Sequence, residues 1–296
     1  MNTDKSAKSE WFYHGAILAS ALFFALSTLL AKFAVHDNVS TWTVTFMRFF
    51  IGFLVILAYL PFANTPLEPR NVWVLVFRGV SNWLAVYLFY LAIRYTTITN
   101  ANLLNLTYPV FVALLAPLFL REYLKLRDWF VLAMAGAGIY LVVNPNFQHV
   151  NIGDLIGLAG GVTAGFAIIA LCFARKDNHT VTVLLVMLGV GTILSAPAVF
   201  TENFTRFSGR TWIILIACGT TGVAGQFAIT AAFKHLSAFA GSITGMARVV
   251  MAAILGFFFL AEIPTWNVVA GSIVLFTAIA LLSGSGKNIQ LERKAS

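Results

Sequence analysis

Two segments of the same character, PVFVALLAPLFLRE at residues 109–122 and VVMAAILGFFFLAE at residues 249–262, decide the fold of this 296-residue chain. Each is a continuous apolar stretch that ends in a glutamate, and a shift of 140 residues places Glu122 on Glu262. The same shift also pairs Gly79 with Gly219, Ala92 with Ala232, and Arg94 with Lys234. Weak internal symmetry at a constant shift indicates a repeated structural unit.

Apolar runs of this kind recur along the whole chain. A helix needs about 20 predominantly apolar residues to cross the hydrocarbon core of a membrane. Ten runs come close to that length, at about 14–35, 43–63, 71–93, 101–120, 128–144, 153–174, 180–200, 211–233, 239–261 and 265–284. Only 10% of the residues are charged, against about 25% in a soluble domain. The sequence therefore predicts an all-α polytopic membrane protein with ten transmembrane helices and argues against a soluble enzyme.

The repeat divides these ten helices into two sets of five. Because five is odd, the second set must cross the membrane in the opposite direction, which gives inverted repeats of the kind found in secondary transporters. We expect a tail at residues 1–13, a first repeat at 14–144, a second repeat at 152–285 and a tail at 286–296. The first apolar run is too long for a secretory signal, so we expect it to be retained.

Lysine and arginine are distributed unevenly between alternate loops. With the N-terminus inside, the inner segments hold Lys5, Lys8, Arg70, Arg121, Lys125, Arg127, Arg175, Lys176, Lys234, Lys287, Arg293 and Lys294. The outer loops hold Arg94, Arg206 and Arg210. Cytoplasmic loops are enriched in these residues. We therefore expect both termini in the cytoplasm and a bacterial inner (plasma) membrane location.

Several short motifs resemble those of a known family. They are Met47-Arg48-Phe49 in the second run, Arg78-Gly79 and Ala92-Ile93-Arg94-Tyr95 in the third, and Tyr108-Pro109-Val110-Phe111 with Glu122 in the fourth. With the ten short runs they resemble the drug/metabolite transporter superfamily, and its EamA-like family most closely. The resemblance implies a transporter of metabolites, amino acids or drugs. The second repeat departs from the pattern, because Val249 replaces the proline and Arg248 stands where the first repeat has Tyr108.

Four basic residues lie within the apolar runs: Lys32, Arg48, Arg78 and Arg248. Such residues are costly in a membrane and mark functional sites or specific pairing. No acidic residue lies well inside a run, so we expect an anionic group of the solute to balance them. Arg248 lies farthest from the helix ends and is the predicted anchor for that group. Lys32 is also a candidate, although its long side chain could instead reach the interface. Arg78 is a further candidate, and both Arg48 and Arg78 could instead bind backbone carbonyls or a neighbouring helix.

Aromatic and amide side chains complete the predicted solute site. Trp83, Tyr87 and Tyr90 recur at a spacing that places them on one face of the third helix. They are predicted to hold the organic body of a solute, with ordinary packing as the alternative. Asn102, Asn105 and Tyr108 share a face of the fourth helix, and Gln226 lies in the eighth. These polar groups are predicted to line the pathway, with hydrogen bonds between helices as the alternative. Pro109 and Pro117 are expected to bend the fourth helix.

The sequence contains no motif of a metalloprotease, hydrolase or nucleotide-binding loop. We therefore predict no enzymatic activity, cofactor or metal site, and no nucleic-acid partner. The predicted function is secondary, non-ATP-driven transport of a small organic solute with an anionic or carboxylate group by alternating access within the lipid bilayer. Alternatives are an exporter of neutral or aromatic amino acids or amphipathic drugs with structural arginines, and a channel. The sequence does not specify the oligomeric state, and a monomer is compatible with it.

Overall fold

The computed structural model describes residues 2–63, 67–96, 98–144, 151–260, 263 and 265–283. All regular structure within these residues is helical. Nine helical spans there are long and apolar enough to cross a membrane, and Trp266–Leu282 forms a shorter apolar helix. The prediction of an all-helical protein with ten spans is confirmed. Glu262 and the tail at 286–296 lie outside the described residues.

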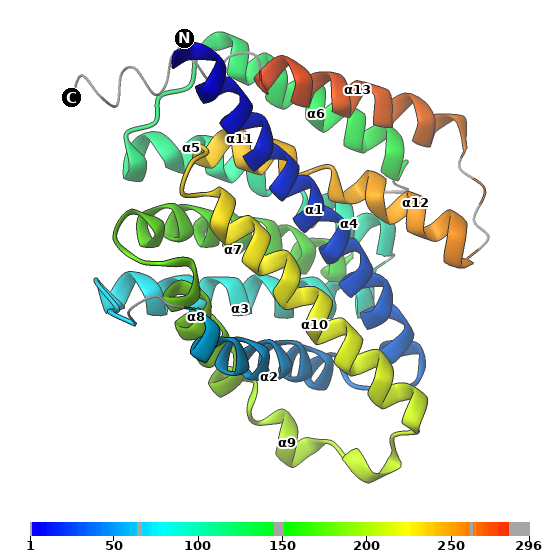
Figure 1. Ribbon diagram of the computed structural model, residues 1–296. Helices are drawn as coiled ribbons and strands as arrows, with labels where there is room; N and C mark the ends of the chain where they lie inside the picture. The colour runs from blue at the N-terminus through cyan, green and yellow to red at the C-terminus, as the bar shows by residue number, and fades with distance from the viewer. Residues whose placement is uncertain are drawn as a thin grey trace.

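The helices follow one another with short connections (Figure 1). The first five spans are α1 (Asn2–His36), α2 (Thr41–Tyr59), α3 (Val72–Tyr95), α4 (Ile98–Asn105) with α5 (Tyr108–Leu120), and α6 (Leu126–Val143). The second five are α7 (Ile152–Asp177), α8 (Thr180–Ser195) with α9 (Ala198–Thr201), α10 (Gly209–Ala232), α11 (Ala238–Gly245) with α12 (Arg248–Leu260), and α13 (Trp266–Ser283). Single 3₁₀ turns, η1 (Leu60–Phe62) and η2 (Phe204–Arg206), lie in two connections.

The main helix pairs follow the twofold logic of the repeat. The most extensive contacts are between α3 and α7, α1 and α10, α6 and α13, and α2 and α8. Exchanging each helix for its counterpart in the other repeat converts the α1–α10 pair into the α7–α3 pair. The same exchange returns the α6–α13 and α2–α8 pairs to themselves. The two repeats are therefore intertwined, and the centre of the molecule is built from both.

The fourth and ninth spans are each broken near their middle. Each is an eight-residue helix followed, after two residues, by a thirteen-residue helix. Pro109 accounts for the first break, since it lacks an N–H and its ring conflicts with the carbonyl four residues earlier. The interruption predicted at Pro109 is thus present, whereas Pro117 lies within the continuous helix α5. The second break, at Met246 and Ala247, was not predicted. No proline follows it, and α11 ends instead at Gly245, a poor helix former.

Glycines permit the close approach of helices around these breaks. On α7, an added Cβ at Gly161 would lie 2.6 Å from the Leu104 carbonyl oxygen, and one at Gly165 would lie 2.7 Å from the Phe111 Cβ. A side chain at either position would push α7 away from α4 and α5. Both halves of the fourth span therefore pack closely against α7, as small residues allow in membrane proteins.

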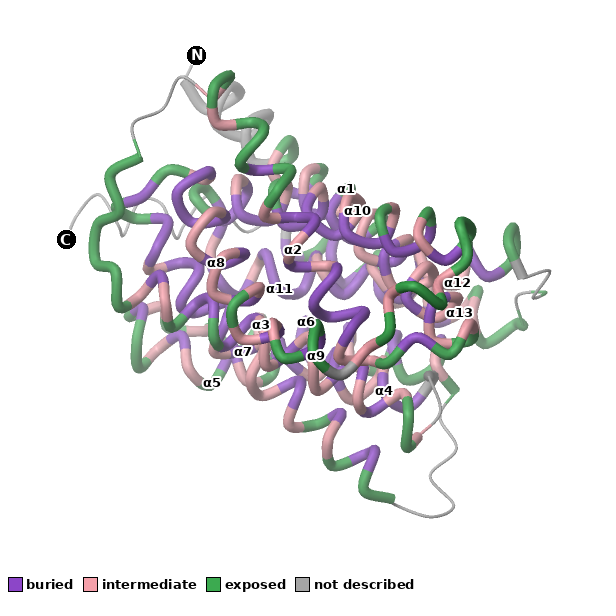
Figure 2. The backbone as a smooth tube through the Cα atoms, turned by 90° about the horizontal axis from the view of Figure 1, so that it is seen from below, coloured by how far each residue is buried: buried purple, intermediate pink, exposed green. Residues whose placement is uncertain are grey.

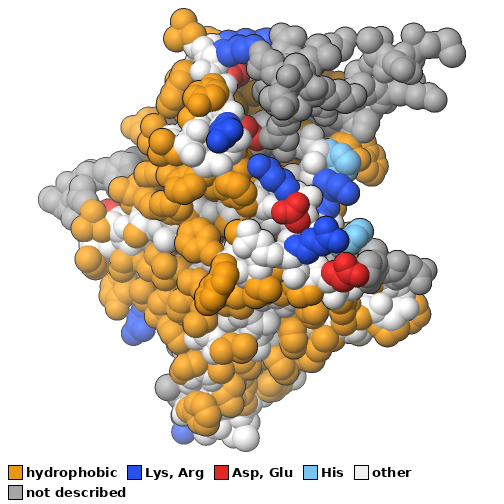
Figure 3. Space-filling model, turned by 90° about the vertical axis from the view of Figure 1, so that its left-hand side faces the viewer, with side chains coloured by type: hydrophobic (Ala, Val, Ile, Leu, Met, Phe, Trp, Pro, Cys, Tyr) orange, Lys and Arg blue, Asp and Glu red, His pale blue; other side chains and the backbone are white. Residues whose placement is uncertain are grey.

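The outside of the bundle is apolar, and the polar groups gather at its ends. Buried backbone occupies the middle, whereas exposed residues lie on outward faces and at helix ends (Figure 2). Exposed outer residues include large apolar side chains such as Phe258 and Leu118. Figure 3 shows one end of the bundle, where charged side chains and histidines gather between hydrophobic surfaces. This is the arrangement expected of a multi-pass membrane protein.

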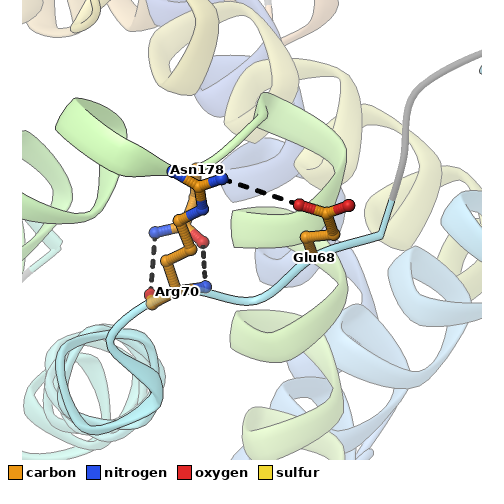
Figure 4. Close-up of polar contacts among 3 residues, drawn as sticks. All are labelled: Glu68, Arg70 and Asn178. Atoms are coloured by element: carbon orange, nitrogen blue, oxygen red, sulfur yellow. Dashed lines mark hydrogen bonds and ion pairs between the residues drawn. The ribbon is translucent and has the colours of Figure 1, made fainter.

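One link at this end joins the two repeats (Figure 4). The Asn178 Oδ1 accepts a hydrogen bond of 2.8 Å from the Arg70 amide, and its Nδ2 donates one of 3.0 Å to the Arg70 carbonyl. The Arg70 side chain forms an exposed ion pair with Glu68 at 3.7 Å. Arg175 is buried beside this link and donates to the Asn178 carbonyl and, at 2.9 Å, to that of Thr230. The loop before α3 is thereby fixed to the end of α7.

Candidate substrate-binding cavity

A cavity of about 110 Å³ lies in the middle of the bundle, next to both helix breaks. It is large enough for several water molecules. Both repeats contribute to its walls, at the position where inverted-repeat transporters bind their solutes. Three arginines and three amides are among its lining residues: Arg48, Arg78, Arg248, Asn82, Asn105 and Gln226.

Arg48 extends from α2 to the wall that α1 and α3 form. Its Nη1 donates a hydrogen bond of 2.7 Å to the Tyr90 hydroxyl. Its guanidinium carbon lies 5.6 Å from the centre of the Phe24 ring and 5.9 Å from that of Tyr90. Both rings lie within the range of cation–π attraction. Gly222 on α10 leaves the necessary space, because a Cβ there would lie 3.2 Å from the Arg48 Nε.

Arg78 projects from α3 into the space between α7 and α10 and is only 2% exposed. Its Nη1 donates to the Ala167 carbonyl at 3.0 Å, and its Nη2 donates to Oε1 of Gln226 at 3.2 Å. The Gln226 Nε2 donates in turn to Oδ1 of Asn82 at 3.2 Å. Gln226 therefore connects two residues that lie one helical turn apart on α3.

Arg248 is the first residue of α12 and directly follows the second helix break. Its Nη2 donates a hydrogen bond of 2.8 Å to Oδ1 of Asn105, the last residue of α4. Its guanidinium carbon lies 5.8 Å from the centre of the Phe89 ring. Tyr108, the counterpart of Arg248 in the first repeat, donates at 2.9 Å to the Ser242 carbonyl of α11. The two broken spans are thus joined by two hydrogen bonds, one donated by the second repeat to the first and one donated by the first repeat to the second.

The cavity has a strongly positive electrostatic environment. No aspartate or glutamate is among the described residues that line it. Arg48 and Arg248 lie close enough for their charges to repel each other. The helices α5 and α12 begin beside it while α4 and α11 end there, so the partial charges of these helix ends oppose one another and the arginines determine the sign. One arginine at the centre of a membrane helix costs about 2.5–3.5 kcal/mol, so three without an acidic partner among the described lining residues leave a large unbalanced positive charge.

The structure brings together half of the predicted site residues. Arg248, Asn105, Tyr108, Gln226 and Arg78 all line the cavity. Tyr90 is buried and does not line the cavity itself, but its hydroxyl accepts a hydrogen bond from Arg48, which does.

The remaining predicted site residues lie outside the cavity lining: Trp83, Tyr87, Asn102 and Lys32. Trp83 stacks on Tyr87 with 5.7 Å between ring centres, and its Nε1 donates to the Ser195 hydroxyl at 2.8 Å. Trp42 packs edge-on against both rings. The aromatic face of α3 is therefore occupied by α2 and α8. Trp83 and Tyr87 thus pack against other helices outside the cavity lining, and their contact with a solute stays a prediction.

The cavity face of α3 carries a different stripe, formed by Arg78, Asn82, Ala85 and Phe89. These residues recur at intervals of four, three and four, which defines one face of a helix. The polar residues of this stripe, Arg78 and Asn82, are visible in the sequence and could have indicated that this face of the helix is the polar one. Arg48 and Phe24 are further cavity residues that the sequence did not assign to the solute. Phe24 lacked any such signal, because the chain contains 27 phenylalanines, most in apolar runs.

A buried histidine lies on α1, about one helical turn before the cavity-lining Ile17. His14 on α1 is 2% exposed, and its Nδ1 lies 2.7 Å from the Thr244 Oγ1 on α11. At the same end of the bundle, Oε2 of Glu122 accepts a hydrogen bond of 3.0 Å from the Ala238 amide at the start of α11. At the other end, Oε2 of Glu202 accepts one of 2.8 Å from the Thr43 hydroxyl. Each glutamate thus binds the first turn of a helix from the other repeat.

Comparison with known proteins agrees with this architecture. A crystal structure of a protein 18% identical in sequence superposes with a TM-score of 0.74, covering 93% of this chain and 97% of the other, which shows a shared fold. The pseudopaline exporter CntI of Pseudomonas aeruginosa is 27% identical over 273 residues, covering 92% of this chain and 95% of the relative. The S-adenosylmethionine uptake transporter of Rickettsia felis is 22% identical over 288 residues, covering 97% of this chain and 95% of the relative.

A mammalian carrier is similar as well. Solute carrier family 35 member G1 of Mus musculus is 27% identical over 275 residues, covering 86% of this chain and 73% of the relative. The names of these relatives are those of transporters or carriers, not of enzymes. The model of the EamA-like transporter family matches residues 11–144 and again residues 151–284. The chain is therefore a multi-pass membrane protein that belongs to the EamA-like transporter family.

Proposed function

We propose that this protein is a secondary transporter of a small organic solute that carries an anionic group, such as a carboxylate. One observation carries the proposal: Arg48, Arg78 and Arg248 line a central cavity that has no acidic residue among its described lining residues. Transport of small solutes agrees with the relatives, whose names specify pseudopaline and S-adenosylmethionine. The anionic group is inferred from the charge of this chain's own cavity.

Arg248 is the proposed anchor of the anionic group. Its guanidinium has five N–H donors, and one of them is already held by Asn105. Asn105 therefore orients the side chain while leaving donors for a solute. The ring of Phe89 under the guanidinium restricts it further. Tyr108 supports the same region by fixing α5 to the carbonyl of Ser242 on α11.

The contacts between the repeats suggest how access alternates. The hydrogen bond from Ala238 to Glu122 closes α11 against α5 at one end, and the bond from Thr43 to Glu202 links α2 to the second repeat at the other. Opening either end requires the contact there to break while the opposite contact persists. We propose that the two repeats rock about the cavity in this way. The lysine and arginine bias supports a location in a bacterial inner membrane with both termini in the cytoplasm.

One observation favours the competing function, export of neutral amino acids or amphipathic drugs. Each of the three arginines already has a hydrogen-bond partner within the protein: Tyr90 for Arg48, Gln226 for Arg78 and Asn105 for Arg248. In that case the arginines would stabilise the bundle and would not contact the solute. The two functions differ in which solutes bind and in the effect of losing the Arg248 charge.

A binding screen followed by transport tests the proposal. Purified protein would be heated with mono- and dicarboxylates, neutral amino acids and a lipophilic cation, and the compounds that raise the unfolding temperature would be assayed for uptake into liposomes. We expect carboxylates to stabilise the wild type. Hydrogen bonds to charged groups contribute about 1.5–3 kcal/mol, so Arg248→Gln should weaken carboxylate binding by about 10- to 150-fold.

A matched control removes the same charge elsewhere. Arg94 lies on an exposed part of α3, so Arg94→Gln should bind carboxylates as the wild type does, and Arg248→Lys should bind with intermediate affinity. If only neutral or cationic compounds stabilise the protein, or if Arg248→Gln binds carboxylates with wild-type affinity, the proposal is wrong.

A further inference from the structure

Two buried hydrogen-bond donors beside the cavity lack an acceptor. They are the Nε of Arg78 and the Nδ2 of Asn82, and neither has a partner within the part of the chain that the structure describes. Both residues line the cavity, and they are only 2% and 7% exposed. Buried polar groups are nearly always paired, and an unpaired donor calls for a specific explanation.

The neighbouring acceptors bind other donors. The Ala167 carbonyl accepts from Nη1 of Arg78, and the amide of Gln226 is engaged at both its oxygen and its nitrogen. The two free groups are donors only, and one belongs to a cation without a described acidic partner. A carboxylate is acceptor-only and can receive several hydrogen bonds. The Arg78–Asn82 pair is therefore chemically suited to an anionic oxygen pair.

This pair lies far along α3 from the place where Arg248 approaches. The guanidinium of Arg248 lies over the ring of Phe89, and Phe89 follows Arg78 by eleven residues on α3. At the rise of an α-helix, the Phe89 Cα is about 16 Å from that of Arg78 and about 10 Å from that of Asn82 along the helix axis. Between them the part of the cavity wall that α3 contributes is apolar, with Ala85 and Val86. The cavity thus has a donor-rich site near each end and an apolar middle.

From this arrangement we infer that the solute is an extended dianion, with two acidic groups separated by an apolar linker. This inference rests on the proposed function, in which Arg248 and Asn105 hold one acidic group. The second acidic group is held by the Nε of Arg78 and the Nδ2 of Asn82. The linker lies along the apolar wall. Arg78 is therefore a specificity-determining residue that selects diacids over monoacids.

The test compares molecules that differ only in the second charge. Straight-chain diacids from succinate to sebacate are compared with their monomethyl esters, which keep the length but remove one carboxylate. Binding is measured by calorimetry on purified full-length protein. We expect one diacid length to bind at least about tenfold more tightly than its own monoester, the ratio that one added charged hydrogen bond provides.

Variants then locate the second carboxylate. Arg78→Gln should reduce the diacid-to-monoester affinity ratio to about one. Asn82→Asp keeps the shape of the side chain and can pair with Arg78, so it should fold even where Arg78→Gln does not. Its negative charge should also reduce the ratio, because it repels the incoming carboxylate. Arg94→Gln, which removes a charge from the exposed part of the same helix, should keep the wild-type ratio.

The outcomes separate this inference from the proposed function. If monoesters bind as tightly as diacids of every length and Arg248→Gln abolishes both, the anionic solute stands and the second site is refuted. A wild-type ratio in Asn82→Asp also refutes the second site. If neither diacids nor monoesters bind, the proposed function fails together with the inference.

Discussion

Replacing Gly271 with alanine tests the contact between α6 and α13, which lies outside the cavity. A Cβ at position 271 would lie 2.5 Å from the Gly138 carbonyl oxygen and 2.7 Å from the Val142 amide nitrogen. Ordinary contact begins at 3.4 Å, so the helices would have to separate by about 0.9 Å. Both clashing groups belong to the backbone and cannot rotate away. A gap of that size forfeits up to about half of the dispersion attraction across the interface.

The expected magnitude follows from two opposing effects. Overpacking of this kind costs up to about 3 kcal/mol, while replacing glycine with alanine inside a helix returns about 1 kcal/mol. Gly271→Ala should therefore lower the free energy of unfolding by about 2 kcal/mol. Gly136 on α6 provides the control, because nothing lies within 4 Å of a Cβ there. Gly136→Ala should be neutral or slightly stabilising.

The assay is reversible unfolding in mixed detergent micelles as the fraction of denaturing detergent rises, followed by circular dichroism. Gly271→Ala should unfold at a lower denaturant fraction than the wild type, and Gly136→Ala should not. Neither α6 nor α13 contributes a residue to the cavity, so carboxylate affinity should be unchanged in both variants. Equal unfolding midpoints for the two variants would show that α6 and α13 are not in backbone contact.

Three further predictions concern contacts between the repeats. Glu122→Ala removes the acceptor for the first turn of α11 and should lower the unfolding free energy by about 1 kcal/mol. Glu122→Gln keeps an acceptor, so its unfolding free energy should fall less. Equal losses of unfolding free energy in the two variants would contradict this. Partial burial opposes ionisation of Glu202, but hydrogen bonds from Thr43 and Ser40 outweigh it and hold the pKa of Glu202 below its ordinary 4.5. The contribution of the ionised Glu202 to stability is therefore complete above pH 4.5 and is lost as the pH falls through the lower pKa of the folded state. Glu202→Gln should make the unfolding free energy less dependent on pH in that acidic range. An unchanged pH dependence would argue against the contact. Tyr90→Phe removes the acceptor for Arg48 and should destabilise the protein by about 1.5–3 kcal/mol in the same detergent titration; a wild-type midpoint would show that Arg48 finds another acceptor.

The sequence predicted the broad architecture because membrane insertion leaves a strong one-dimensional signal. Each span must bury its backbone polar groups in a helix and cover it with apolar side chains, so ten runs such as 101–120 were recognisable without tertiary information. The bend of the fourth span was also predictable, since Pro109 acts on its own helix. The break of the ninth span was not, because Val249 stands where the proline would be.

The candidate site was only partly predictable, for a different physical reason. The cost of a buried charge singled out Arg78 and Arg248 in the sequence, and amide spacing pointed to Asn105. Periodicity shows which residues share a helix face but not which neighbour that face meets. For this reason Trp83 was expected beside the solute, although it packs between α2 and α8.

The sequence by itself thus determined that this chain is an all-helical membrane protein with a repeated half, and that cations without acidic partners lie inside it. Only the tertiary structure decided which of these cations share a cavity. It placed Arg48, Arg78 and Arg248 around one space and left Lys32 outside. It also showed that Arg78 retains a donor without a partner among the described residues. Helix-to-helix contacts form between residues as far apart as Asn105 and Arg248, and no local pattern encodes their meeting.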